Sequence, residues 1–208
     1  MVSIEAELIE RVLPNGDVED LIDGIADAQA EILGQVVGST DVTLDGERDD
    51  VRTGETNLGN LIVDAMIYET GADIALTNGG GIRASIDPGD ITIGDIITVL
   101  PFGNYIVTTT VTGAQLKEAL ELGTSSYPET MGAFPHVANI TFTINTANAA
   151  GSRVEDLMVK GVAVADTDVF VIATNDFMYA GGDGYEMLTN GIENEFAALD
   201  EAVIEDLA

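Results

Sequence analysis

The 208-residue chain is predicted to fold as an α+β domain, with helices layered on mixed β-sheets. Apolar residues make up 46% of the sequence and the mean hydropathy is +0.22, so the chain can bury a sizeable core. Segments with apolar residues at helical spacing occur beside short segments rich in β-branched residues. The two kinds of segment alternate irregularly, which favours mixed sheets over a regular doubly wound parallel sheet.

The chain is expected to contain one domain and a short lead-in. Residues 1–17 are polar, carry a turn signal at residues 14–16, and are predicted to be a lead-in or interdomain linker. Residues 18–208 show no internal repeat and no low-complexity stretch, and are predicted to form the domain. An alternative is that the linker also includes the first predicted helix, residues 18–33.

The first elements are predicted from apolar spacing. A helix is expected over residues 18–33, with Asp17 as its N-cap and Gly34 as its stop. Residues 36–44 are predicted to form a strand, and residues 45–50 a charged loop.

The middle of the chain carries clearer boundary signals. Thr56 is a candidate N-cap for a second helix that stops at Gly71. Residues 73–77 are predicted to form a short buried strand, residues 94–99 a short helix, and residues 105–112 a β-branched strand.

The remaining elements follow from the same two patterns. We predict a helix at residues 114–122, strands at residues 137–144, 154–159 and 169–174, and a closing helix at residues 195–207.

The charge balance excludes one class of function and suggests a habitat. Seven Lys and Arg residues against 37 Asp and Glu residues give a net charge of −30. Binding of a nucleic-acid polymer through a basic face is excluded, because phosphate neutralisation needs clustered Lys and Arg. An acidic surface with so little lysine suits high salt, where the Debye length shrinks to ~3 Å at 1 M. We therefore predict a halophilic or marine origin, with an acidic secreted protein of ordinary habitat as the alternative.

Other classes are disfavoured by what the sequence lacks. There is no cysteine, and therefore no disulfide or thiolate metal site. Residues 1–5 show no secretory signal pattern, and no run approaches the ~18 apolar residues that a membrane span requires.

Three glycine-rich loops each follow an apparent strand or buried element, which is where ligand-binding loops are often built. They occupy residues 78–83, 100–104 and 177–184. Glycines let a backbone approach a ligand closely, and the loops also carry an amide, aromatic rings and an acid. Each loop taken alone has a structural alternative: a tight turn at residues 78–83, a core phenylalanine at residues 100–104, and a turn with a solvated aspartate at residues 177–184.

Two arginines stand out because the chain has so few cations. Arg83 ends the first glycine-rich loop, and Arg52 lies just before the second predicted helix. An anionic ligand would be repelled by the overall charge, so local cations would have to capture it. The alternative is that both arginines pair with neighbouring carboxylates.

Four segments in this order carry a resemblance to a known family. They read ETNLGNLIVDAM at residues 55–66, NGGGIR at residues 78–83, LPFG at residues 100–103 and GGDGY at residues 181–185. From about residue 18 to the end, the chain resembles the C-terminal domain of the 5'-nucleotidase family. That family includes UDP-sugar hydrolases and 2',3'-cyclic-nucleotide 2'-phosphodiesterases, which act in nucleotide catabolism.

The resemblance implies a nucleoside pocket in this chain. Phe102 and Phe177 match the two aromatic residues that sandwich the base, where stacking needs no particular base sequence. Asp183 matches the acid that holds the ribose hydroxyls.

The resemblance also implies a phosphate contact. Arg52 and Arg83 match the arginines that contact the phosphate nearest the ribose, and Asn78 matches an asparagine of the same pocket. The implied ligand is a nucleotide or nucleoside, and the implied location of the parent protein is extracellular, periplasmic or on the cell surface.

No catalytic or metal-ligating residue is predicted in this chain. The family's two divalent metals lie on an N-terminal metallophosphatase domain, which would be the partner in cis, and metal-assisted phosphate hydrolysis requires such a cluster. The single histidine, His136, is predicted to be a structural or surface residue. The chain alone is therefore expected to be inactive, although its parent would be a phosphoric ester hydrolase. The alternative is a non-catalytic interaction module of a large extracellular acidic protein.

Overall fold

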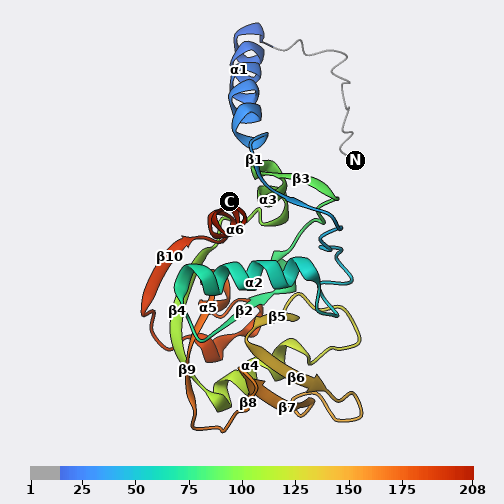
Figure 1. Cartoon of the computed structure of the whole chain (residues 1–208), viewed down its shortest axis with the longest axis vertical. Helices are drawn as coiled ribbons and strands as arrows, with labels where there is room; N and C mark the ends of the chain where they lie inside the picture. Colours follow the sequence, from blue (N-terminus) through green and yellow to red (C-terminus); the bar gives the residue numbers. More distant parts are fainter. Residues whose placement is uncertain (1–14) are drawn as a thin grey trace, which may run out of the picture.

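The computed structural model describes residues 15–208, so most of the predicted lead-in lies outside the described residues. It confirms the α+β class with mixed sheets (Figure 1). The central sheet has five strands in the order β10 (Asn194–Ala198), β4 (Tyr105–Thr112), β9 (Val169–Asn175), β2 (Ile74–Asn78) and β5 (Pro135–Ala138). Two smaller sheets contain β1 (Val36–Thr40) with β3 (Gly89–Thr92), and β6 (Ile140–Ile144) with β7 (Val154–Val159) and β8 (Val162–Ala163).

Strand direction in the central sheet decides where the loops meet. The pair β2 and β9 is parallel, whereas β4 is antiparallel to β9, with Ile106 opposite Asn175. The ends of β2 and β9 and the beginning of β4 therefore lie at one edge of the sheet. The loops after residue 78, before residue 105 and after residue 175 are brought together at that edge.

Helices cover both faces of the central sheet. Alternate residues of a strand point to opposite faces, and β2 follows this rule. Ala75 belongs to the core beneath α2 (Asn57–Thr70) and α6 (Leu199–Leu207), whereas Ile74 and Leu76 belong to the core beneath α4 (Gly113–Gly123). The sheet thus separates two apolar cores.

Helix α2 begins and ends where the sequence predicts. The Thr56 hydroxyl accepts a hydrogen bond from the Gly59 amide, which caps the first turn. Gly71 has φ 64°, the left-handed conformation that terminates a helix at little cost for glycine. The short α3 (Ile93–Val99) is preceded by a capping box between Thr92 and Asp95.

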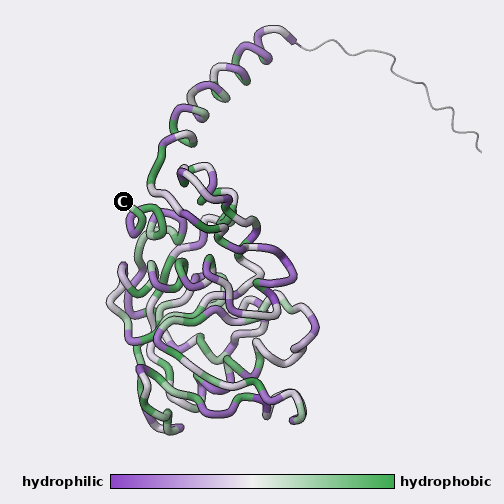
Figure 2. Tube along the Cα trace, turned by 45° about the vertical axis from the view of Figure 1, so that its right-hand side comes forward, coloured by the Kyte–Doolittle hydropathy of each residue, from purple (hydrophilic) through white to green (hydrophobic). Residues whose placement is uncertain are grey.

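Helix α1 (Gly16–Leu33) projects from the body of the domain, and its apolar residues alternate with acidic ones (Figure 2). Its large apolar side chains are exposed, from 36% at Leu33 to 63% at Leu21. The predicted N-cap is wrong by two positions: the Asn15 side chain accepts from the Asp17 amide, so Asn15 is the cap. Asp17 instead lies in the first turn, where its negative charge interacts favourably with the helix dipole.

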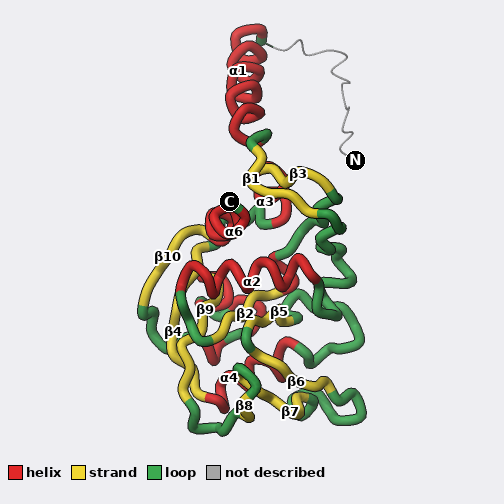
Figure 3. Tube along the Cα trace, in the orientation of Figure 1, coloured by secondary structure: helices red, strands yellow, loops and turns green. Residues whose placement is uncertain are grey.

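Three predicted elements differ from the structure (Figure 3). The first predicted strand is shorter, because β1 ends at Thr40 and Leu44 forms only an isolated bridge to Ile86. The strand predicted at residues 137–144 is broken at Asn139, where φ is 63°, into β5 and β6 of two different sheets. The helix predicted at residues 195–207 begins only at Leu199, because the residues before it pair with β4 as strand β10.

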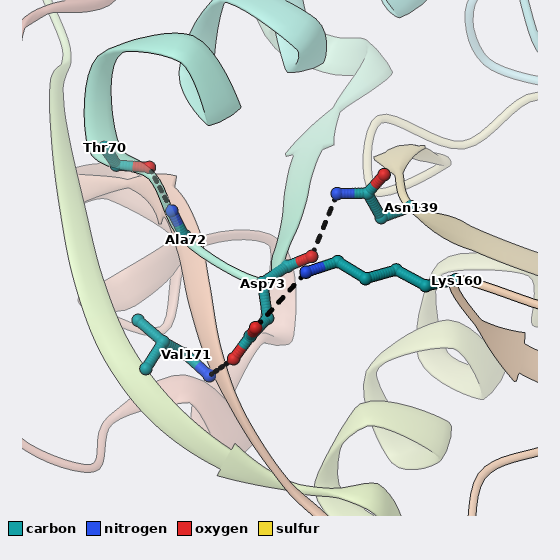
Figure 4. A network of polar contacts seen from close by, with 6 residues as sticks. All are labelled: Thr70, Ala72, Asp73, Asn139, Lys160 and Val171. Atoms are coloured by element: carbon teal, nitrogen blue, oxygen red, sulfur yellow. Dashed lines mark hydrogen bonds and ion pairs between the residues drawn. The ribbon is translucent and has the colours of Figure 1, made fainter. Parts of the chain in front are cut away.

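A polar network fastens the edge of the sheet opposite the loops (Figure 4). The Asp73 carboxylate lies 3.3 Å from Lys160 Nζ and accepts a 3.1 Å hydrogen bond from the Val171 amide. Its carbonyl accepts from the Asn139 side chain at 3.0 Å. The starts of β2 and β9 are thereby tied to the small sheet that contains β7.

Within residues 15–208, no helix combines the length and the apolar character that crossing a lipid bilayer requires.

Candidate functional site

A cavity of about 530 Å³ opens at the edge of the central sheet where the loops meet. Its volume is in the range of small-molecule sites. It is lined by all six residues predicted from the sequence, together with four others: Arg52, Asn78, Gly80, Gly81, Arg83, Phe102, Asn104, Gly132, Phe177 and Asp183. The structure therefore brings together residues that are up to 131 positions apart, counted from Arg52 to Asp183 (183 − 52).

The first wall of the cavity is the glycine loop that follows β2. It forms a 3₁₀ turn, η1 (Gly79–Gly81), and the Gly80 amide donates a 2.7 Å hydrogen bond to the Gly132 carbonyl. A Cβ atom on Gly80 would lie 2.9 Å from that same carbonyl oxygen, closer than real Cβ contacts come. Glycine is required here because two backbones approach each other directly.

The two predicted aromatic residues expose their rings to solvent. Phe102 is 59% exposed and Phe177, in α5 (Asp176–Tyr179), is 45% exposed. The alternative of a core phenylalanine at a turn is therefore wrong for Phe102. Exposed rings in a cavity offer flat apolar faces for stacking. The Arg83 guanidinium carbon lies 5.7 Å from the centroid of the Phe102 ring, within the range of a cation–π contact.

The acid of the third loop is held by a chain of two amides. Asn78 Nδ2 donates a 2.8 Å hydrogen bond to Asp183 Oδ2, and Asn175 Nδ2 donates at 3.1 Å to Asn78 Oδ1. Asp183 lies in η2 (Gly182–Gly184) with φ 54°, in the left-handed region that aspartate tolerates better than most residues. The carboxylate is thus oriented rather than free in solvent.

Tyr185 anchors the loop that carries Asp183. Its ring is fully buried, and its hydroxyl donates a 2.6 Å hydrogen bond to the Ala133 carbonyl. Burial raises the pKa of Tyr185 far above its ordinary value, so the hydroxyl stays protonated as a donor. Gly123 leaves room for this hydroxyl, since a Cβ there would lie 2.6 Å from it.

Within the described part of the chain, neither Arg52 nor Arg83 forms an ion pair with a carboxylate. Within residues 15–208 the ion pair found is Lys160 with Asp73, so the alternative that Arg52 and Arg83 serve as salt-bridge partners is wrong. Arg83 donates to the Gly80 carbonyl at 3.3 Å, and Arg52 Nε is buried without a partner. Burial and the neighbouring Arg48 and Arg83 lower the pKa of Arg52, although a guanidinium remains charged at any ordinary pH. The cavity holds cationic groups with unused donors.

The described residues contain no group of three or more His, Asp or Glu side chains placed to hold a metal ion. His136 is 1% exposed and lies in β5, where it does not line the cavity. The donor set therefore does not fit a dinuclear metal centre, and no metal-assisted step is assigned to these residues.

Sequence reasoning missed part of the lining. Asn104 lies in the glycine-rich loop at residues 100–104, and its side-chain amide donates a 2.8 Å hydrogen bond to the Asp176 carboxylate. No spacing rule distinguishes it from an ordinary turn asparagine. Gly132 belongs to a segment without any local motif, and it lies in the cavity wall beside Gly80, whose amide donates to its carbonyl, and beside the Asp183 carboxylate. Contacts of this kind depend on the assembled sheet.

Comparisons with known proteins agree with this architecture. A sequence profile described as "5'-nucleotidase, C-terminal domain" matches residues 36–190. The chain is 44% identical over 195 residues to the trifunctional nucleotide phosphoesterase protein YfkN of Bacillus subtilis, covering 89% of this chain and 13% of that protein. It is 40% identical over 163 residues to protein UshA of Escherichia coli, covering 78% of this chain and 28% of that protein.

A solved structure shows the same fold. The crystal structure of a 5'-nucleotidase precursor from Thermus thermophilus superposes with a TM-score of 0.83 and 36% sequence identity, over 92% of this chain and 40% of that one. The chain therefore spans well under half of the length of each of these three proteins.

Proposed function

The chain belongs to the 5'-nucleotidase C-terminal domain family, and from this premise we propose that it binds the nucleotide substrate of a phosphoric ester hydrolase. One observation carries the proposal. A single cavity contains two exposed aromatic rings, an oriented carboxylate and two arginines that form no ion pair with any carboxylate of residues 15–208. These groups match the three chemically different parts of a nucleoside monophosphate.

Each part of the ligand would meet a different group. The base stacks between Phe102 and Phe177, which offer apolar faces that accept any base. The ribose hydroxyls donate to the Asp183 carboxylate, whose position Asn78 maintains.

The phosphate nearest the ribose is bound by the cations of the cavity. Arg52 and Arg83 present planar donor forks that suit phosphate oxygens. In a chain with net charge −30, these local cations also offset the repulsion that an anionic ligand meets.

Hydrolysis itself is assigned to another part of the parent protein. The two divalent metals of the family would be held by an N-terminal metallophosphatase domain, where they would supply Lewis-acid activation of the phosphate ester and of a water molecule. In this proposal residues 18–208 are the substrate-binding domain, residues 1–17 are interdomain linker, and the chain alone does not turn over nucleotides.

The setting of the parent protein follows from the family and from the charge. We place it outside the cytoplasm, as an extracellular, periplasmic or cell-surface enzyme of nucleotide catabolism in a salt-rich habitat. The alternative of a non-catalytic interaction module gains no support from the relatives, two of which are named a nucleotide phosphoesterase and a 5'-nucleotidase precursor.

Calorimetry with AMP and adenosine tests the proposal. Both ligands are expected to bind the chain, and Phe102→Ala or Asp183→Ala is expected to weaken adenosine binding about tenfold or more, because one lost stacking contact is worth ~1–3 kcal/mol. Tyr68→Ala and Asp64→Ala are matched controls, since both residues are exposed on α2 and neither lines the cavity. Undiminished adenosine binding by both cavity variants would refute the assignment.

A further inference from the structure

His136 is a buried histidine behind the cavity. It belongs to β5 and pairs with Thr77 of β2, the residue just before Asn78. Its side chain is 1% exposed. A polar ring in such a place destabilises the fold unless it is hydrogen-bonded, so its contacts bear on its role.

The ring makes one hydrogen bond, and that bond determines its tautomer. His136 Nε2 lies 2.9 Å from the Val51 carbonyl oxygen. A carbonyl only accepts, so Nε2 carries the proton and donates. His136 Nδ1 is buried and has no partner, and burial lowers the pKa of the imidazole, which is therefore neutral at pH 7.

Two glycines make room for this contact. A Cβ atom on Gly59 would lie 2.0 Å from His136 Nδ1, and a Cβ atom on Gly79 would lie 1.8 Å from the Val51 carbonyl oxygen. Neither position accepts a side chain while the ring and the carbonyl stay in place. Gly59 comes from α2 and Gly79 from the cavity loop, so the contact is enclosed by two separate elements.

The bonded carbonyl belongs to the residue before Arg52. The Arg52 carbonyl in turn accepts a 3.2 Å hydrogen bond from the Met131 amide. The backbone on both sides of the Arg52 side chain is thus fastened. Arg52 Nε has no hydrogen-bond partner, and the guanidinium is repelled by Arg48 and Arg83 and attracted by Asp183 and Asp49. It forms no ion pair within residues 15–208, so the hydrogen-bonded backbone fixes where the side chain starts.

We propose that His136 is a positioning residue for anion binding: its Nε2–H holds the Val51 carbonyl and thereby directs Arg52 into the cavity. The inference rests on the proposed function, in which Arg52 contacts the phosphate. The inference predicts different effects on ligands with a phosphate and ligands without one. Loss of the hydrogen bond would weaken the contact with a phosphate but leave the stacking and ribose contacts unchanged.

The test compares AMP with adenosine in calorimetry of the full chain at pH 7.5. His136→Leu removes the donor, whereas His136→Gln keeps an amide donor close to the position of Nε2. We expect His136→Leu to lower AMP affinity about tenfold while adenosine affinity stays within about twofold, because hydrogen bonds to charged groups are among the stronger ones. His136→Gln is expected to restore most of the AMP affinity.

A control separates positioning from general loss of stability. Leu116→Ala removes a fully buried side chain from the core beneath α4, away from Val51 and Arg52, and is expected to leave the ratio of AMP to adenosine affinity unchanged. If His136→Leu does not fold, His136→Asn replaces it, because the shorter amide falls short of the Val51 carbonyl.

Nitrogen-15 NMR of the single histidine gives a readout that needs no ligand. The neutral Nε2–H tautomer is expected, and an Nδ1–H tautomer would overturn the inference. So would a wild-type ratio of affinities in folded His136→Leu. A wild-type chain that binds neither ligand would instead overturn the proposed function, and this inference with it.

Discussion

Asn78 and Asp183, 105 residues apart in the sequence, are joined by a 2.8 Å hydrogen bond from Nδ2 to Oδ2. The bond links the end of β2 to the loop that follows α5, and Asn175 at the end of β9 supports it from behind. Two amide side chains at the ends of two parallel strands thus determine where the carboxylate of Asp183 points in the cavity.

Replacement of Asn78 by aspartate is expected to weaken adenosine binding. The change keeps the shape of the side chain but removes the donor and sets a second carboxylate against Asp183, so the two acids repel. We expect about a tenfold loss of adenosine affinity in calorimetry. Asn194→Asp adds the same charge at an exposed position outside the cavity and should bind as the wild type does. Equal affinities in the two variants would contradict the role of Asn78.

Replacement of Arg83 by lysine is expected to weaken the binding of AMP but not that of adenosine. Lysine keeps the charge but lacks the planar fork that binds two phosphate oxygens at once. AMP affinity should fall about tenfold, whereas adenosine affinity should change little. Arg48→Lys is the matched control, because Arg48 is exposed and does not line the cavity. A parallel loss of both ligands in Arg83→Lys would indicate a structural role instead.

The stability of the fold is expected to depend on pH through His136. Burial lowers the pKa of this imidazole in the folded chain below its ordinary value of 6.5, so the unfolded chain binds the proton more readily. The contribution of the neutral ring is therefore present above pH 6.5 and is lost as the pH falls below it.

Urea unfolding at pH 7.5 and 5.5, with salt held constant, measures this effect. Relative to His136→Gln, the wild type should lose stability at the lower pH, by at most about 1.4 kcal/mol for one pH unit below 6.5. The difference between the two proteins isolates the histidine from the many carboxylates that both share. A difference independent of pH would contradict the prediction.

Salt is expected to raise the thermal stability. At net charge −30 the folded chain repels itself, and the Debye length falls from ~10 Å at 0.1 M to ~3 Å at 1 M salt. The unfolding midpoint should rise by about 5 °C or more over that range, which for a chain of this size corresponds to roughly 1–2 kcal/mol. Sodium chloride is the salt to use, since sulfate also stabilises proteins by exclusion from their surface. A midpoint that does not rise would remove the argument for a salt-rich habitat.

Local signals predicted much of the fold and of the cavity. Strand β4 and strand β7 have the predicted bounds, and Thr56 and Gly71 delimit α2 as expected, because caps and β-branched runs act over a few residues. The six cavity residues were found because their loops contain glycine, aromatic or charged residues in an order typical of a family.

The remaining features depend on contacts between distant segments. Residues 195–198 have a helical pattern but form β10, since the open edge of β4 offers them backbone partners. Asn139 turns the chain from one sheet to another, which apolar spacing across residues 137–144 does not reveal. Gly132 and His136 contribute through hydrogen bonds that involve backbone atoms of distant residues. Patterns within a single sequence do not reveal such contacts.

The order of strands has a consequence for how the protein is made. Strand β9, which begins at Val169, lies between β4 and β2, although both of those are synthesised earlier. Until β9 is synthesised, β2, which ends at Asn78, and β4, which follows the Phe102 loop, lack the strand that lies between them. Pairings between such distant segments form late in folding. Phe177 and Asp183 follow β9 in the sequence, so no nascent fragment that ends before Val169 contains all six predicted cavity residues.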